Sequence, residues 1–127
     1  MQKRLCALVA ALMVLTQAPS AVAHAQISSS SVKPGAAIRV WPKSLWVEFD
    51  GNLIQFEGSK ANTLTVKDLK NKQIDLKNSS VAGARISIAL GKAPAPGKVT
   101  VAWRVVSEDG HPVTSSFIFL YLPLAKK

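Results

Sequence analysis

The sequence predicts an all-β fold, namely a Greek-key β-sandwich or barrel of seven to eight strands with an Ig-like arrangement. Apolar residues recur at alternate positions in short segments, as they do in half-buried strands. Turn residues separate these segments at intervals of roughly 8–12 residues. After residue 23 no segment shows a helical period, and none repeats. We therefore expect two layers of strands around one core.

The two longest predicted strands close the chain. Residues 98–106 have apolar side chains at positions 99, 101, 103 and 105, so one face of this strand should lie in the core. Residues 113–122 carry aromatic side chains at positions 117, 119 and 121 and aliphatic ones at positions 118, 120 and 122. Because both faces are apolar, we expect the last strand to be covered on both sides.

Shorter strands are predicted earlier in the chain. Residues 44–50 alternate most regularly, with apolar side chains at 45, 47 and 49 on one face. Residues 63–67 and 73–77 alternate on either side of a polar loop, which predicts a hairpin. The other candidate strands are residues 24–32, 37–41, 53–57 and 85–90.

The N-terminus has the features of an export signal. A basic start is followed by an uncharged, mostly apolar run over residues 5–15, and Ala21-Val22-Ala23 is a small-x-small cleavage site. The apolar run is too short to span a bilayer. We predict a signal peptide over residues 1–23 and one periplasmic domain over residues 24–127 that does not insert directly into a membrane. Cleavage after Ala25 is the alternative, because Ala23-His24-Ala25 is also an A-x-A.

The composition excludes several classes of function. Loss of Lys3 and Arg4 with the leader lowers the formal charge from +9 to +7. The remaining lysines are scattered and not clustered with aromatic residues, so we expect no nucleic-acid binding. Cys6, Met1 and Met13 all lie in the leader. The mature chain therefore forms no disulfide and has no sulfur ligand for Cu(I) or for a thiolate zinc site.

The chemically most informative residues lie between the last two predicted strands. Asp109 and His111 flank Gly110 in a tight turn that ends at Pro112. In extended backbone, residues i and i+2 project to the same side, so the carboxylate and the imidazole can point together. An Asp-Gly turn is also common for backbone reasons alone. Read by itself, the turn is explained more readily by a solvated loop than by a metal site.

The second histidine favours a metal site. Cleavage after Ala23 makes His24 the new N-terminus, where its α-amine and imidazole can chelate one metal. With the imidazole of His111 and the carboxylate of Asp109, this gives three nitrogen donors and one oxygen donor. Such donors in a tetragonal arrangement favour Cu(II), and Zn(II) would bind less tightly. The sequence thus predicts one Cu(II) per chain, provided that the first strand brings His24 beside the turn.

Enzymatic sites are poorly supported by the sequence. A Ser-His-Asp triad would have to use His111, and no serine lies in a nucleophile elbow. There is no Gly-rich phosphate loop and no dinucleotide fingerprint. The carboxylates of Glu48, Asp50 and Glu57 are explained by alternation on a solvent-exposed face. We therefore predict a protein that is not an enzyme.

The mature sequence resembles the CopC family of periplasmic copper-binding proteins over essentially its whole length. The most specific match is residues 103–113, Trp-Arg-Val-Val-Ser-Glu-Asp-Gly-His-Pro-Val, which lead to Phe117. Weaker matches are the Ala-x-Ala before His24, the segment Ser-Ser-Ser-Val-Lys-Pro-Gly-Ala at residues 29–36, and Leu-x-Val-x-Phe at residues 45–49. Two departures are the shifted Pro34 and the region Phe49-Asp50-Gly51, where an acid often follows the Phe in the family. Asp50 is therefore only a candidate neighbour of the site.

The resemblance implies a Greek-key β-barrel or sandwich that binds Cu(II) through the amine and imidazole of the mature N-terminal His and an Asp-x-His pair. These positions match His24, Asp109 and His111. It also implies a role in copper sequestration, delivery or tolerance, beside a CopD-type inner-membrane partner. Some members carry a methionine-rich Cu(I) site, which should be absent here because no methionine follows Met13.

Two other functions remain open from the sequence. An N-terminal histidine that binds copper is also the catalytic device of lytic polysaccharide monooxygenases. Those enzymes are usually larger, present a flat aromatic face, and lack the equatorial carboxylate that Asp109 would supply. The other alternative is a metal-free β-sandwich interaction domain, in which the turn is a solvated loop.

Overall fold

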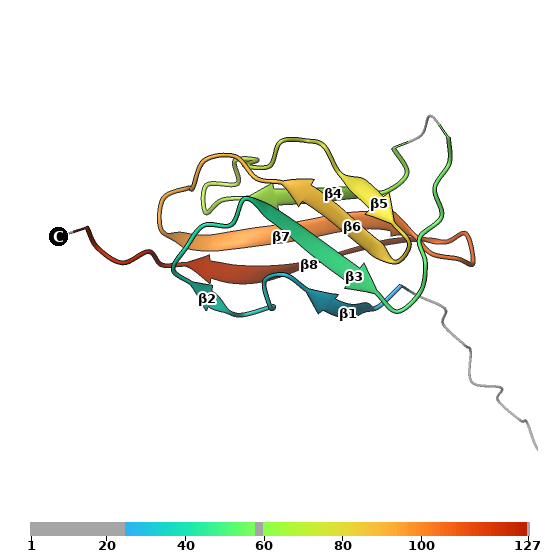
Figure 1. The fold of residues 1–127 in the computed structure, drawn as a ribbon, viewed down its shortest axis with the longest axis horizontal. Helices are drawn as coiled ribbons and strands as arrows, with labels where there is room; N and C mark the ends of the chain where they lie inside the picture. Colours follow the sequence, from blue (N-terminus) through green and yellow to red (C-terminus); the bar gives the residue numbers. More distant parts are fainter. Residues whose placement is uncertain (1–24, 58–59, 127) are drawn as a thin grey trace, which may run out of the picture.

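Two four-stranded sheets face each other in the computed structural model, which describes residues 25–57 and 60–126 (Figure 1). In order across the first sheet lie β1 (Ile27–Ser30), β3 (Ser44–Phe49), β6 (Arg85–Ala89) and β5 (Ser80–Ala82). In order across the second lie β2 (Ala37–Ile38), β8 (Pro112–Tyr121), β7 (Gly97–Val106) and β4 (Thr63–Lys67). Neighbouring strands are antiparallel except β2, which runs parallel to β8.

The strand order confirms the predicted fold class. The strands are ordered as in an immunoglobulin-type Greek key. Strands β1-β3-β6-β5 correspond to its four-stranded sheet, and strands β8-β7-β4 correspond to its three-stranded sheet. Strand β2 is added beside β8 at the edge of the second sheet. Within the described ranges no helix is long and apolar enough to cross a membrane.

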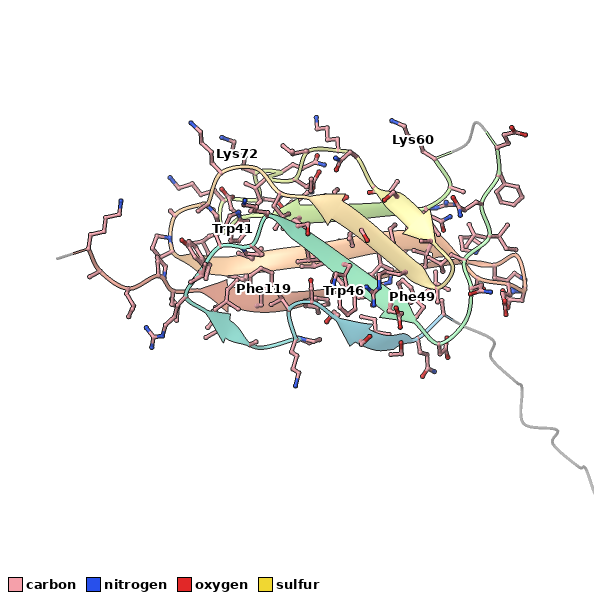
Figure 2. The ribbon with its side chains drawn as sticks, viewed as in Figure 1. Trp41, Trp46, Phe49, Lys60, Lys72 and Phe119 are labelled. Atoms are coloured by element: carbon pink, nitrogen blue, oxygen red, sulfur yellow. The ribbon has the colours of Figure 1, made fainter. Side chains whose placement is uncertain are left out.

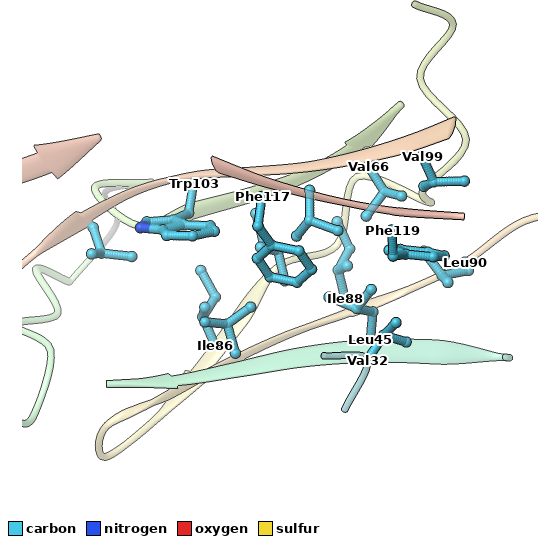
Figure 3. Packing of buried hydrophobic residues seen from close by; sticks show 14 of the residues in the cluster. Val32, Leu45, Val66, Ile86, Ile88, Leu90, Val99, Trp103, Phe117 and Phe119 are labelled. Carbon is cyan, nitrogen blue, oxygen red and sulfur yellow. The ribbon is translucent and has the colours of Figure 1, made fainter. Parts of the chain in front are cut away.

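The core lies between the inner faces of the two sheets, as the alternation predicted. Strand β3 contributes Leu45, which is fully buried, and strand β8 contributes Phe119, which is also fully buried. Trp103 on β7 packs against Phe117 on β8 (Figure 3) and against Phe49 on β3, with ring centroids 5.9 Å apart in both contacts. Aromatic residues therefore join three strands at the centre of the sandwich.

Two predicted strands are absent from the described structure, and one strand was missed. Residues 53–57 make only an isolated bridge from Leu53, and residues 73–77 make isolated bridges instead of the predicted hairpin. The side chain of Asp75 is the physical reason, because its Oδ2 accepts the N–H of Val66 in β4 at 2.7 Å, where a paired strand would place a carbonyl. Asp75 is buried and Leu76 is 58 % exposed, the reverse of the prediction. Strand β5 begins at Ser80, where the sequence predicted only a break.

The last strand is covered on one face only, so the prediction that both its faces are covered was wrong. Ile118 and Leu120 on the outer face of β8 are 44 % and 39 % exposed, and Leu122 just beyond the strand is 43 % exposed. In a two-layer sandwich the outer face of each sheet meets solvent, and no described element packs over this one. The apolar residues on this face therefore remain on the surface.

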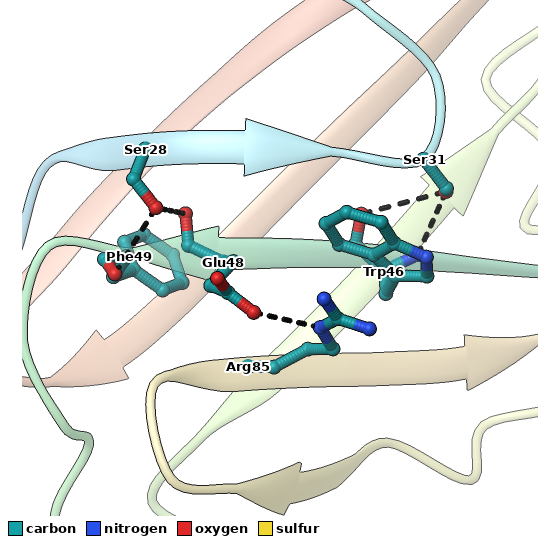
Figure 4. Close-up of polar contacts among 6 residues, drawn as sticks. All are labelled: Ser28, Ser31, Trp46, Glu48, Phe49 and Arg85. Carbon is teal, nitrogen blue, oxygen red and sulfur yellow. Dashed lines mark hydrogen bonds and ion pairs between the residues drawn. The ribbon is translucent and has the colours of Figure 1, made fainter.

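The outer face of the first sheet is held by polar contacts around Arg85 (Figure 4). The Arg85 side chain donates from Nε to Glu48 at 2.9 Å, and its guanidinium lies 3.8 Å from the ring centroid of Trp46. The hydroxyls of Ser28 and Ser31 bond the main chain of β3 next to these residues. Because Arg85 and Glu48 are partly exposed, the pair adds less to stability than the buried core does.

The strand directions place different segments at the two ends of the sandwich (Figure 1). The turn end carries residues 107–111 between β7 and β8, the loop 50–62 after β3, and the start of β1. The opposite end carries the loops 39–43, 68–72 and 91–96 and the C-terminal residues 122–126. The predicted metal ligands Asp109 and His111 therefore lie at the turn end.

Candidate metal centre

The turn that carries Asp109 and His111 is closed by main-chain hydrogen bonds. Gly110 donates to the carbonyl of Ser107 at 2.9 Å, and Ser107 donates to the carbonyl of His111 at 3.2 Å. Gly110 has a φ of +81°, a left-handed conformation that a residue with a side chain adopts only at a cost. The glycine therefore lets the chain reverse within three residues, which leaves both flanking side chains on the same turn.

Asp109 and His111 are in direct contact, as their spacing predicted. Oδ2 of Asp109 lies 3.0 Å from Nδ1 of His111, and Oδ1 of Asp109 accepts the His111 N–H at 3.0 Å. The hydroxyl of the buried Ser107 also donates to Oδ1. The imidazole is 77 % exposed and the carboxylate side chain 28 % exposed. Solvent and dissolved ions thus reach the pair directly.

The Asp109 carboxyl is held in its charged form. The hydrogen bond from Ser107 and then the bond from the His111 N–H lower the pKa of Asp109 from 3.8 to about 2. The charge of the His111 imidazole adds a smaller effect in the same direction. Because a metal competes with protons for its ligands, a carboxylate that stays ionised at low pH is available to a cation over a wide pH range.

The spacing of the two side chains fits adjacent ligands of one metal ion. Two donors at right angles around a first-row metal, with bonds of about 2.1 Å, are separated by about 3.0 Å. The observed separation of Nδ1 and Oδ2 is 3.0 Å, which is the length of the hydrogen bond between them, so a metal held by these two atoms would replace that bond. Nitrogen and oxygen donors at right angles are the donor set that Cu(II) prefers in tetragonal sites. The pair therefore fits one edge of such a site.

The pair does not complete a metal site within the described residues. In residues 25–57 and 60–126, no three His, Cys, Asp or Glu side chains are grouped so that they could hold a metal ion. The third predicted ligand, His24, lies outside these ranges. The described residues thus provide two donors, Asp109 and His111, and a complete metal site needs further donors from outside the described residues.

The chain next to His24 is anchored at the turn end. Gln26 and Asp50 form a reciprocal pair, in which the Asp50 N–H donates to the Gln26 carbonyl at 2.8 Å and the Gln26 N–H donates to Asp50 Oδ1 at 3.1 Å. Ala25 packs against the hydrophobic core. The start of β1 is therefore fixed to the end of β3, two residues after His24.

The loop after β3 connects this anchor to the turn. Leu53 bridges Ser107, and the Ile54 N–H donates to the carbonyl of Val106 at 2.9 Å. Between these contacts and Asp50, a Cβ placed on Gly51 would lie 3.4 Å from the Glu108 carboxylate. The sequence marked Asp50 only as a candidate neighbour and did not single out Glu108. The sequence signal that could have pointed to Glu108 is its position directly before Asp109.

Comparison with known proteins identifies the relatives of the chain. The CopC domain family matches residues 27–121, which are the whole sandwich. The chain belongs to the CopC family. Copper resistance protein C of Escherichia coli is 29 % identical over 112 residues, which cover 84 % of this chain and 88 % of the relative. Protein YobA of Escherichia coli strain K12 is 27 % identical over 113 residues, covering 86 % of this chain and 90 % of the relative.

Solved structures share the fold of this CopC domain. CopC from Methylosinus trichosporium OB3b superposes with a TM-score of 0.69 at 19 % identity, over 82 % of this chain and 99 % of that one. PcoC from Escherichia coli, described as a methionine-rich copper resistance protein, superposes with a TM-score of 0.59 at 21 % identity, over 78 % and 99 %. The present chain has only Met1 and Met13, both before the domain. Copper binding thus follows from the family, whereas a methionine-rich site has no residues here to form it.

Proposed function

We propose that this CopC protein is a periplasmic, non-catalytic carrier of one Cu(II) ion. Its ligands would be the α-amine and imidazole of His24, exposed as the new N-terminus by cleavage after Ala23, together with Asp109 and His111. The contact between the Asp109 carboxylate and the His111 imidazole carries the proposal, because it offers an anionic oxygen and a nitrogen 3.0 Å apart on an exposed turn.

The anchoring of the first strand supports the role of His24. Gln26 is hydrogen-bonded to Asp50 at the turn end, and Leu53 in the same loop bridges Ser107. Two residues of extended chain reach about 7 Å. That reach, starting from Gln26, keeps the N-terminal amine within about 7 Å of the anchored start of β1.

Local charge also supports cation binding at the turn end. Asp50, Glu108 and Asp109 are exposed acids on neighbouring segments, in a protein whose formal net charge is +9. Their negative charge raises the local concentration of cations, and it does so most strongly at low ionic strength. A strongly basic protein can thus still attract Cu(II) to one end.

A Cu(II) titration of the exported protein tests the proposal. We expect one tightly bound Cu(II) per chain, and a rise in melting temperature that corresponds to about 4 kcal/mol at a thousandfold excess over the dissociation constant. His111→Ala and Asp109→Asn should each weaken binding by more than tenfold. Asp50→Asn is the matched control, because it removes a negative charge from the same end, while the Asn Oδ1 can still accept the Gln26 N–H and the Asp109–His111 pair stays intact.

Acetylation of the N-terminal amine separates its contribution from that of the His24 imidazole. The acetylated protein keeps the imidazole and loses the free amine, so the proposed chelate ring is lost. We expect the acetylated protein to fold normally and to bind Cu(II) much more weakly. Unchanged affinity in the acetylated protein would show that the N-terminal amine is not a ligand. Equal losses in Asp50→Asn and Asp109→Asn would show that only local charge matters.

A further inference from the structure

The fold gathers basic residues that are scattered in the sequence. The opposite end of the sandwich exposes basic side chains on all its loops, among them Arg39, Lys43, Lys70, Lys72, Lys92 and Lys98. The ion pairs of the described residues, Arg85 with Glu48 and His111 with Asp109, both lie on the turn-end half of the molecule. The basic groups of the opposite end are thus available to an external anion.

The two acids of this end, Asp68 and Asp75, offset only part of its positive charge. Asp75 is buried, and its oxygens accept hydrogen bonds from the main chain of Val66 and Lys77. Asp68 accepts the N–H groups of Lys70 and Lys72 within its own loop. The other five of the seven acids lie on the half with the turn end. The long axis of the sandwich therefore runs from an acidic end to a basic end.

Large aliphatic side chains lie among these basic groups. Val40 is 81 % exposed, Leu124 is 70 % exposed and Leu69 is 58 % exposed, each on a different segment of the opposite end. Arg39 precedes Val40, Lys70 follows Leu69, and Lys98 lies opposite Leu120 in the register of β7 and β8. Exposed aliphatic groups and cations are thus interleaved over this end.

We propose that the opposite end docks onto an anionic lipid surface. Charge complementarity favours phosphate headgroups, because the basic residues of this end outnumber its two acids. Aliphatic side chains that project from separate loops suit a fluid surface that closes around them. Lysine and arginine stems can lie along the acyl boundary while their charges stay at the phosphates. This is peripheral adsorption without a membrane span, and it does not depend on the metal site.

Docking by this end would set the orientation of the protein. Strand β7 has ten residues and runs from the opposite end to the turn, so its ends are separated by about 30 Å. The Asp109–His111 pair would therefore face away from the lipid surface into solution. In that position the turn end is accessible to dissolved metal ions and to other proteins.

Flotation of the exported, metal-free protein with lipid vesicles tests the proposal. We expect binding to vesicles of phosphatidylglycerol and phosphatidylcholine, little binding to pure phosphatidylcholine, and release at high salt. Lys72→Ala should weaken partitioning about fivefold, because one basic residue near an anionic surface contributes about 1 kcal/mol. Lys60→Ala is the matched control, since Figure 2 shows Lys60 and Lys72 projecting from different halves of the molecule.

The apolar contribution needs a separate variant. Leu124→Ser removes an exposed aliphatic side chain without touching the core, and it should weaken partitioning several-fold at constant charge. Equal weakening by Lys72→Ala and Lys60→Ala would overturn the proposal, because it would mean that net charge alone attracts the protein. Absence of flotation on both vesicle types would also overturn it, and specific capture by an acidic protein instead would assign this end to a protein partner. None of these outcomes alters the Cu(II) titration.

Discussion

Replacing Ser107 by alanine should release the Asp109 carboxyl from its main constraint. The hydrogen bond from Ser107 is the largest cause that lowers the pKa of Asp109 from 3.8 to about 2. Ser107→Ala removes that donor and leaves the bond from the His111 N–H at 3.0 Å. We therefore expect the pKa of Asp109 to rise from about 2 toward 3.8 in the variant.

The assay is an NMR titration of the Asp109 side-chain carboxyl in both proteins. At pH 3 the wild-type carboxyl should be about nine-tenths ionised, whereas a carboxyl with an ordinary pKa would be mostly protonated. A group with a lowered folded-state pKa adds stability above its unfolded pKa and loses it as pH falls through the folded pKa. The stability of the wild type should thus decline between about pH 4 and pH 2 through Asp109, and this decline should shrink in the variant.

The control for this titration is Ser116→Ala, which removes an exposed hydroxyl from β8 away from the turn. It should leave the pKa of Asp109 unchanged. A wild-type pKa near 3.8, or a pKa that stays near 2 in Ser107→Ala, would refute the assigned hydrogen-bond geometry. It would also weaken the argument that Asp109 is a pre-ionised ligand.

Four further substitutions probe the fold, and one of them lies in the turn that carries Asp109 and His111. Gly110 and Gly35 have φ values of +81° and +76°, and a Cβ added to either would have no atom within 4 Å. Gly110→Ala and Gly35→Ala should therefore each lower the free energy of unfolding, measured in urea, by about 1 kcal/mol through backbone strain alone. A clear difference between the two variants would contradict a purely conformational cost. Asp75→Ala leaves the Val66 N–H without its partner and should cost about 3 kcal/mol, and a loss under about 1 kcal/mol would show that water replaces the carboxylate. Phe119→Ala empties a fully buried position and should cost about 4 kcal/mol by the same unfolding assay, so a near-neutral result would contradict the packing described.

Alternation in the sequence was sufficient to predict most of the sandwich. It succeeded in β3, β7 and β8 because the inward-facing residues that form the core recur at every second position of these strands. It failed at residues 73–77 because Asp75 enters the interior to bond the edge of β4, which reverses the faces expected from the apolar residues. It also failed to show that the outer face of β8 is exposed, since composition alone does not reveal how many layers a fold has.

The Asp109–His111 pair was predictable because its geometry is local. Two residues on either side of a glycine turn project together regardless of the rest of the fold. The anchoring of Gln26 by Asp50 and the bridge from Leu53 to Ser107 were not predictable, because they join segments that are distant in the sequence. The same holds for the basic end, where loops from separate parts of the chain come together. His24 is outside the described residues, so its role remains a prediction.

Native mass spectrometry of the exported protein after addition of Cu(II) tests the proposed site of His24, Asp109 and His111. One spectrum reports both the first residue of the mature chain and the number of copper ions bound. We expect a chain that begins at His24 and carries one copper ion. A chain that begins at Gln26, or a chain that begins at His24 and retains no copper, would contradict it.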